Sequence, residues 1–173
     1  MNSFEQQISN ADLSLFERIE SQSTEKDKKS LLTCQFAVRE LTRQYNYLEI
    51  GSYLGGSIQP HLMDERCKKI YSIDKRPEFQ PDERGVAYQY QNNSTRRMLE
   101  LLETVSAENI SKITTIDADT GEINASQIKD KIDLCFIDGE HTDEAVFSDF
   151  LFSFNTLQEN GGGNNLSRRF YYL

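Results

Sequence analysis

The residues with the clearest chemical potential stand in a short segment around Gly51. An apolar run at 47–50 carries an acid, Glu49, and is followed by Gly51 and, four residues later, by Gly55. A strand that turns at glycine and continues into a helix can hold a nucleoside-type ligand, because glycine permits close backbone approach and the helix start offers N–H groups. The next apolar run ends in Asp74, an acid that could accept both hydroxyls of a ribose. The pattern predicts a nucleoside-binding strand, turn and helix.

The spacing argues against two common phosphate-binding motifs. A dinucleotide fingerprint has a second glycine two residues after the first, but Tyr53 stands there. A P-loop has lysine after its last glycine, but Ser57 stands there. An acid beside the turn also suits a ligand with a sulfonium and an ammonium better than one with a pyrophosphate. The alternatives are an ordinary corner of an α/β protein and, less favoured because of Tyr53, a binder of NAD or a nucleotide sugar.

Further acids follow the two later apolar runs. Asp117 and Asp119 come after one run, and Asp138 comes after the next, with His141 three residues beyond it. A histidine near a carboxylate can take the proton of a hydroxyl, and a cation held by carboxylates makes that hydroxyl more acidic. The alternatives are turns or helix caps for the acids and a surface position for the histidine. The other histidine, His61, is predicted to be structural.

The glycine segment resembles the first motif of class I S-adenosylmethionine (SAM) methyltransferases. The resemblance rests on Glu49-x-Gly51-x-x-x-Gly55 with Asp74 downstream. It implies that Glu49, Gly51 and Gly55 line the methionine part of SAM and that Asp74 binds the ribose. It also implies that Asp119, or the acid two positions before it, contacts the adenine amino group.

The segment Ile137-Asp-Gly-Glu-His141 resembles the Ile-Asp-Gly-x-His segment of small-molecule O-methyltransferases related to macrolide sugar methyltransferases. This resemblance implies that Asp138 contacts the cofactor and binds a divalent metal such as Mg²⁺, and that His141 is the catalytic base. In that branch further acidic ligands follow the fifth strand, where this chain has Asn164, Asn165 and Ser167, so the metal site would be weak. The implied activity is O-methylation of a sugar or hydroxylated metabolite. The alternative is a truncated, non-catalytic protein that binds SAM or a partner.

Hydrophobic periodicity predicts alternating strands and helices. Strands are expected at 47–50, 69–73, 112–116 and 131–137, and helices at 1–22, 28–45, 57–67, 93–105 and 142–158. Right-handed crossovers then imply an α/β, Rossmann-like three-layer sandwich with a mostly parallel sheet. Ligands of such sheets lie beyond the carboxyl ends of the strands, where the acids described above are expected.

The predicted domain organisation has three parts. Residues 1–24 form an N-terminal helical extension, 25–163 an incomplete SAM-binding domain, and 164–173 an atypical tail. The resembled family has seven strands, and only four or five fit this chain, which predicts a truncation after the fourth strand and its helix. A sheet edge left open in this way predicts pairing between copies of the chain.

The composition and net charge of the chain restrict the classes of molecule that it is expected to bind. The chain has 173 residues and a net charge of −9, which disfavours nucleic acids and anionic membranes as partners. Its N-terminus lacks a signal-peptide pattern, and no apolar run is long enough to span a membrane. Three widely spaced cysteines read as reduced thiols. A cytoplasmic protein acting on a small molecule is expected.

Overall fold

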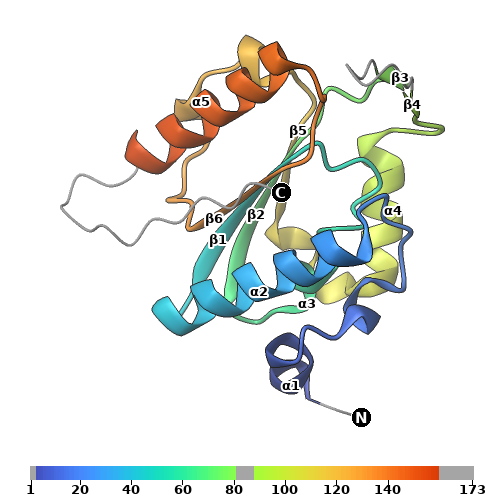
Figure 1. The fold of residues 1–173 in the computed structure, drawn as a ribbon, viewed down its shortest axis with the longest axis vertical. Coiled ribbons are helices and arrows are strands. Elements are labelled where there is room, and N and C mark those ends of the chain that lie inside the picture. Colours follow the sequence, from blue (N-terminus) through green and yellow to red (C-terminus); the bar gives the residue numbers. More distant parts are fainter. Residues whose placement is uncertain (1–2, 81–87, 160–173) are drawn as a thin grey trace.

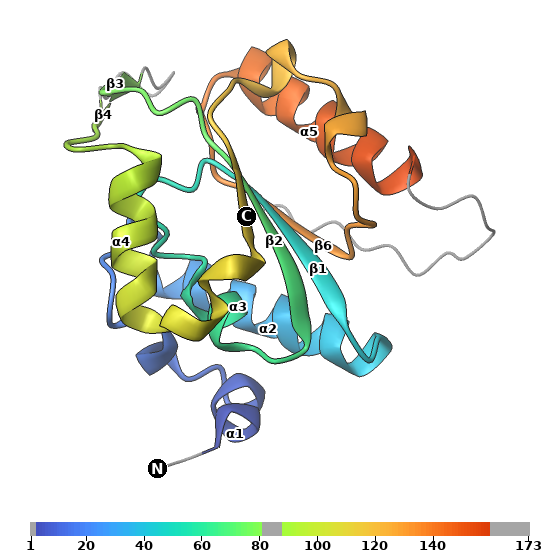
Figure 2. The same ribbon diagram turned by 180° about the vertical axis from the view of Figure 1, so that it is seen from behind.

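The centre of the molecule is a parallel sheet of four strands. The computed structural model describes residues 3–80 and 88–159. Its strand order is β5 (Ile113–Ile116), β2 (Cys67–Ile73), β1 (Tyr45–Ile50) and β6 (Leu134–Ile137), with every neighbouring pair parallel. Helices cover both faces of this sheet (Figures 1 and 2), which confirms the predicted α/β class.

Side chains alternate between two cores, one on each face of the sheet. Tyr47 joins the core under α1 (Phe4–Ser9), α2 (Glu25–Leu41), α3 (Gln59–Met63) and α4 (Thr95–Val105). Its neighbour Leu48 joins the opposite core, which includes Phe152 of α5 (Asp143–Glu159) and Ala125 of a short 3-10 turn (Ala125–Gln127). This period of two is the reason that adjacent residues of β1 serve different layers.

Local signals account for where two helices begin. Thr24 caps α2 in a reciprocal arrangement with Asp27, and Ser94 caps α4 by accepting from the backbone N–H of Arg97. Both residues are of types preferred at helix N-termini, where their side chains satisfy N–H groups that the helix itself leaves open.

The N-terminal part differs from the prediction of one helix over 1–22. It forms α1 and a separate 3-10 turn (Leu13–Phe16), because Ala11 between them has a φ of 48° that no helix continues. Ile8, Leu15 and Phe16 are buried in the same core as the strands. The residues predicted as an extension are therefore part of the packed core.

Several other predicted boundaries are shifted. The helix over 28–45 ends as α2 at Leu41, so Tyr45 opens β1, and the helix over 57–67 is only α3, after which Cys67 opens β2. The strand over 131–137 shortens to β6. Two short antiparallel strands, β3 (Phe79–Gln80) and β4 (Tyr88–Gln89), lie between β2 and α4. The ends of helices and strands fray, so their boundaries commonly differ by a few residues from those that a sequence pattern predicts.

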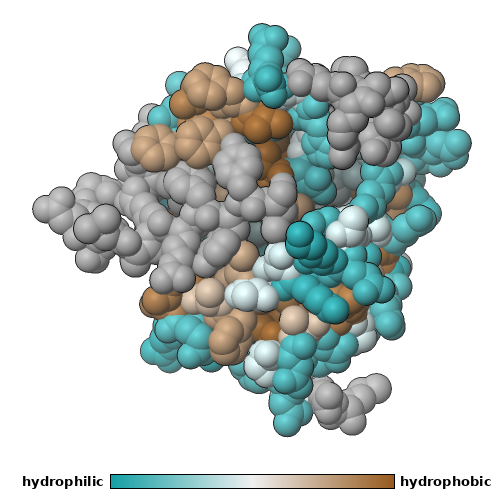
Figure 3. Space-filling model, viewed as in Figure 1, coloured by the Kyte–Doolittle hydropathy of each residue, from teal (hydrophilic) through white to brown (hydrophobic). Residues whose placement is uncertain are grey.

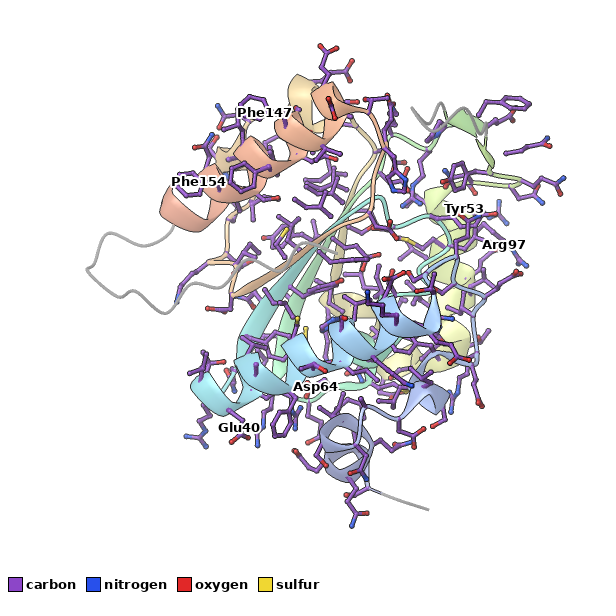
Figure 4. All side chains as sticks on the ribbon, viewed as in Figure 1. Glu40, Tyr53, Asp64, Arg97, Phe147 and Phe154 are labelled. Atoms are coloured by element: carbon purple, nitrogen blue, oxygen red, sulfur yellow. The ribbon has the colours of Figure 1, made fainter. Side chains whose placement is uncertain are left out.

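The surface of α5 carries exposed apolar side chains. Phe147, Leu151 and Phe154 are 62%, 41% and 37% exposed, and apolar atoms gather over α5 at the upper left of Figure 3. The labelled Phe147 and Phe154 both lie on this helix in Figure 4. Within 3–80 and 88–159, no helix combines the length and the apolar character that crossing a membrane requires. The predicted tail at 164–173 lies outside the described residues.

Candidate functional site

The glycine turn lies where the carboxyl ends of the central strands meet. Gly51 follows β1 with a φ of 85°, and its N–H donates to the carbonyl of Ile73 at 2.8 Å. A Cβ atom at Gly51 would lie 2.1 Å from the backbone oxygen of Asp138, and one at Gly55 (φ 82°) would lie 2.8 Å from Leu102 Cδ1. Both positions need glycine because of neighbouring protein atoms and backbone conformation, whereas the motif alone had suggested close approach of a ligand.

Glu49 lies behind this turn and lines neither of the two cavities described below. It is fully buried, and its carboxyl group accepts from the Tyr47 hydroxyl at 2.5 Å and the Ser57 hydroxyl at 2.7 Å. Burial raises the pKa of Glu49 to about 8, although both hydroxyl donors act against this shift. Glu49 was predicted to line the methionine part of SAM. Among Glu49 and its two partners, Tyr47 and Ser57, only Ser57 lines one of the two cavities. Glu49 therefore supports the turn through Ser57.

The raised pKa of Glu49 predicts a specific pH dependence of stability. Between pH 4.5, the ordinary pKa, and about 8, the folded protein holds a proton that the unfolded chain has lost. Stability therefore falls as pH rises through this window, by at most about 1.4 kcal/mol per pH unit. In Glu49→Gln this contribution should vanish. The free energy of unfolding of the variant minus that of the wild type should therefore be larger at pH 8 than at pH 5.

Urea unfolding at both pH values measures this difference. Glu103→Gln is the matched control, because Glu103 is an exposed acid on α4. The same pH dependence in Glu49→Gln and in the wild type would contradict the assignment of a protonated Glu49.

Asp74 lies at the end of β2, where the sequence placed it, and it lines a cavity. Its carboxylate is 7% exposed and accepts from the backbone N–H of Tyr53 at 2.7 Å and of Arg76 at 2.6 Å. A carboxylate has about four acceptor positions, so these bonds leave capacity for a ligand hydroxyl. The glycine turn and the end of β2 are thus joined through Asp74.

Arg76 is a residue of this region that sequence reasoning missed. Its side chain is 8% exposed, and its guanidinium donates to the Tyr53 carbonyl at 2.5 Å and approaches Asp74 at 3.5 Å and Asp117 at 3.4 Å. Tyr53 lies next to the start of α4 in Figure 4, and its hydroxyl donates to the carbonyl of Gln91. Arg76 therefore ties the turn to the neighbouring strand ends, although its sequence context shows only a loop.

The first cavity lies beyond the ends of β2, β5 and β6 and measures about 50 Å³. It is lined by Asp74, Lys75, Asp119, Thr120, Asp138, Glu140 and Asp149, together with backbone and the rings of Tyr53 and Tyr90. Asp119 lines this cavity and Asp117 does not; Asp117 instead accepts from Thr95. Of the two acids considered for the adenine contact, only Asp119 is therefore in position.

Lys75 and Asp149 add charged groups that the sequence did not point to. Lys75 pairs with Glu140 and lies 3.5 Å from Asp119. Asp149 of α5 is buried and accepts from the Thr120 hydroxyl at 2.5 Å, and burial raises its pKa to about 6. An acid inside an amphipathic helix has no local signature, so only packing reveals that it reaches the cavity.

The second cavity lies on the other side of the turn and is larger, about 310 Å³. It is lined by residues 20–24 and Asp27 from the N-terminal part of the chain, and by the glycine turn, Asp138 and His141. His141 Nε2 lies 3.5 Å from Asp138 Oδ1, and the two side chains are 46% and 38% exposed. The structure thus brings the predicted acid and histidine together at a cavity, with Asp138 shared between both cavities.

The structure tests the metal prediction only in part. No group of three or more His, Cys, Asp or Glu side chains suited to a metal ion occurs within 3–80 and 88–159. Asp138 and His141 alone make an incomplete ligand set for Mg²⁺, which prefers near-octahedral oxygen coordination. Asn164, Asn165 and Ser167, the positions discussed for later ligands, lie outside the described residues. His61 lies far from this chemistry, buried in a stack on Tyr47.

Comparison with known proteins complements this geometry. No curated protein sequence matches the chain. Among solved structures, coclaurine N-methyltransferase bound to N-methylheliamine and SAH is similar at 12% identity with a TM-score of 0.40, over 88% of this chain and 49% of that one. The chain therefore spans about half the length of that protein. A family model described as a methyltransferase domain matches residues 48–162. Because this match covers more than half of the chain, the protein belongs to the methyltransferase domain family.

Proposed function

We propose that this protein transfers a methyl group from SAM to a hydroxyl oxygen of a small molecule. The observation that carries the proposal is the Asp138–His141 pair between two cavities, with Asp74 on one side and the second cavity on the other. Methyl transfer needs the acceptor oxygen to lie behind the methyl carbon, so most of the rate gain comes from positioning two ligands side by side. Two cavities that share Asp138 suit that requirement.

The nucleoside part of SAM would lie against the residues that line the first cavity and extend beyond its volume of about 50 Å³. Asp74 would accept the ribose hydroxyls, and Asp119 would accept from the adenine amino group. The methionine part would lie against the glycine turn at Gly51, which lines both cavities. Carboxylates near a sulfonium and an ammonium favour this ligand over a pyrophosphate.

The second cavity would take the acceptor. His141 removes the hydroxyl proton as the new oxygen–carbon bond forms and the sulfur–carbon bond of SAM breaks, and SAH leaves as the product. His141 Nε2 lies 3.5 Å from Asp138 Oδ1, close enough for the carboxylate to orient the imidazole. The proposal contains no metal step, because Mg²⁺ is implied only by the resemblance of the Ile-Asp-Gly-x-His segment.

The cellular setting belongs to the same proposal. A net charge of −9 favours a small molecule over nucleic acid or an anionic membrane. A cytoplasmic location is the default for a chain with this composition. The edge of β6 and the exposed apolar side chains of α5 would support pairing between copies.

The binding part of the proposal is tested by calorimetry with SAH and NAD. We expect SAH to bind and NAD to bind far more weakly. Asp74→Ala should weaken SAH binding by about 2–3 kcal/mol, the range for hydrogen bonds to a charged group.

Glu103→Ala, which removes an exposed acid from α4, controls for the change in net charge. A folded protein that prefers NAD would refute the proposed cofactor. An Asp74→Ala variant that binds SAH like the wild type would remove Asp74 from the site.

A further inference from the structure

We propose that residues 20–27, which we name the wall segment, form the specificity-determining side of the acceptor site and select uncharged or positively charged acceptors over anionic ones. The inference rests on the function proposed above for the second cavity. It extends that function by assigning the acceptor's charge class to a segment that precedes the matched family domain at 48–162.

The wall segment is held in place by one buried side chain, Gln59 of α3. The Gln59 amide donates to the carbonyls of Phe16, Ile19 and Gly56 at 3.1, 2.9 and 2.8 Å. Its oxygen accepts from the backbone N–H groups of Arg18 and Ile19, both at 3.0 Å. Gln59 is fully buried, and breaking such bonds would leave buried backbone groups without partners. The chain just before residue 20 is therefore fixed to the start of α3.

Close packing then sets the wall segment against the glycine turn. A Cβ atom at Gly56 would lie 2.6 Å from the carbonyl oxygen of Glu20 and 2.7 Å from Ser21 Cα. Only a glycine permits this approach, so Gly56 and Gln59 together determine how far the wall segment stands from the Asp138–His141 pair. The position of the wall is a property of packing that involves residues about forty positions apart in sequence.

The ionisable groups on the second cavity define its charge. Glu20 and Asp27 from the wall segment line the same cavity as Asp138, and among residues 3–80 and 88–159 no lysine or arginine lines it. Burial first, and then the negative charge of Glu20, raise the pKa of Tyr53, another residue that lines this cavity. The other titratable side chains among its described lining residues are those of Tyr53, Tyr90 and His141. An anionic acceptor would therefore meet three carboxylates with one histidine to offset them.

Two basic side chains near the wall segment contact groups outside the second cavity. The ammonium of Lys28 lies 5.9 Å from the centre of the Phe16 ring, and the guanidinium of Arg18 donates to the carbonyl of Val105 at 2.7 Å. Neither residue lines the second cavity. The acidic character of the cavity is therefore not compensated by these two cations.

The test uses matched acceptors that differ only in charge. Tyramine, tyrosol and 4-hydroxyphenylacetate form one series, and glucosamine, glucose and glucuronate form a second. Binding of each compound to the SAH-saturated full chain is measured by calorimetry or ligand-observed NMR. We expect the amine and the neutral compound of at least one series to bind, and the carboxylate to bind about tenfold more weakly or not at all.

Two outcomes overturn the inference. One is a carboxylate that binds as well as its neutral counterpart in a protein that binds SAH. The other is a protein that binds SAH but none of the six compounds. Failure to bind SAH itself would instead refute the proposed function, so the two failures are distinguishable.

Variants locate the effect on the wall segment. Glu20→Gln should reduce the discrimination against the carboxylate severalfold and leave SAH affinity unchanged. Glu25→Gln is the matched control, because Glu25 is an exposed acid in the same segment that does not line the cavity. Equal effects of the two variants would show that net charge, and not the wall, governs the preference.

Gln59→Leu tests the positioning role. It should weaken binding of the preferred acceptor about tenfold while SAH affinity changes less than about twofold. A purely structural role would lower the unfolding temperature and both affinities together, which would overturn the assignment of Gln59. Because Glu20→Gln lies on the surface, it keeps the charge inference testable even if Gln59→Leu does not fold.

Discussion

Replacement of His141 by alanine is expected to lower the methyl-transfer rate by about 10²–10⁴-fold, the usual contribution of a general base. SAH affinity should stay within about twofold, because His141 lines the second cavity and not the first. Its imidazole lies 3.5 Å from Asp138, and this pair is the one arrangement of acid and histidine found at a cavity in the described parts of the chain. The measurement is transfer of a labelled methyl group from SAM to a panel of sugars and phenols.

Added imidazole should restore part of the rate in His141→Ala, since it can enter the space left by the side chain. A rate that does not change in His141→Ala would show that another group takes the proton. A wild-type chain that binds SAH but transfers no methyl group to any acceptor would support the alternative of a non-catalytic SAM-binding protein. The binding and transfer assays therefore distinguish a wrong assignment of the catalytic base from a wrong assignment of the methyltransferase activity.

Gly51→Ala is expected to lower the free energy of unfolding by about 3 kcal/mol or more. The residue has a φ of 85°, and the new Cβ would lie 2.1 Å from the backbone oxygen of Asp138. Neither backbone segment can move alone, because the N–H of Asp138 bonds to the carbonyl of Ile50 at 2.9 Å. Relief of the clash must displace Asp138, so SAH binding should weaken in parallel.

Urea unfolding and SAH calorimetry on the same samples measure both effects. Gly121→Ala is the control, because a Cβ there would lie 3.3 Å from Asp119 Oδ1, a side-chain atom that can shift. We expect this control to change stability by less than about 1 kcal/mol. A Gly51→Ala variant as stable as the control would show that the turn tolerates a side chain.

The exposed apolar side chains of α5 and the edge position of β6 among the described strands bear on how the chain behaves in solution. Phe147 is the most exposed of these side chains at 62%. Large exposed apolar residues and edge strands both favour association. The assays above are therefore best run at several protein concentrations, so that an effect of pairing is seen as a concentration dependence.

The layered α/β fold and the strand ends that carry acidic residues could be predicted from local sequence patterns. Alternation of apolar runs with amphipathic segments requires a parallel sheet, and acids that follow such runs must meet at one edge of it. For this reason Asp74, Asp119, Asp138 and His141 all line cavities in the structure, as their positions predicted. These inferences need only local periodicity and the rule for strand ends.

Which of these groups line a cavity, and which other residues line it with them, depends on packing between segments distant in sequence. Glu49 turns inward because its face of β1 packs under α3, and its partner Ser57 reaches the cavity instead. Arg76 and Asp149 enter the site, and residues 20–27 form its far wall, through contacts between segments distant in sequence. Such contacts depend on how helices pack against the sheet, and no pattern within a single segment records that packing.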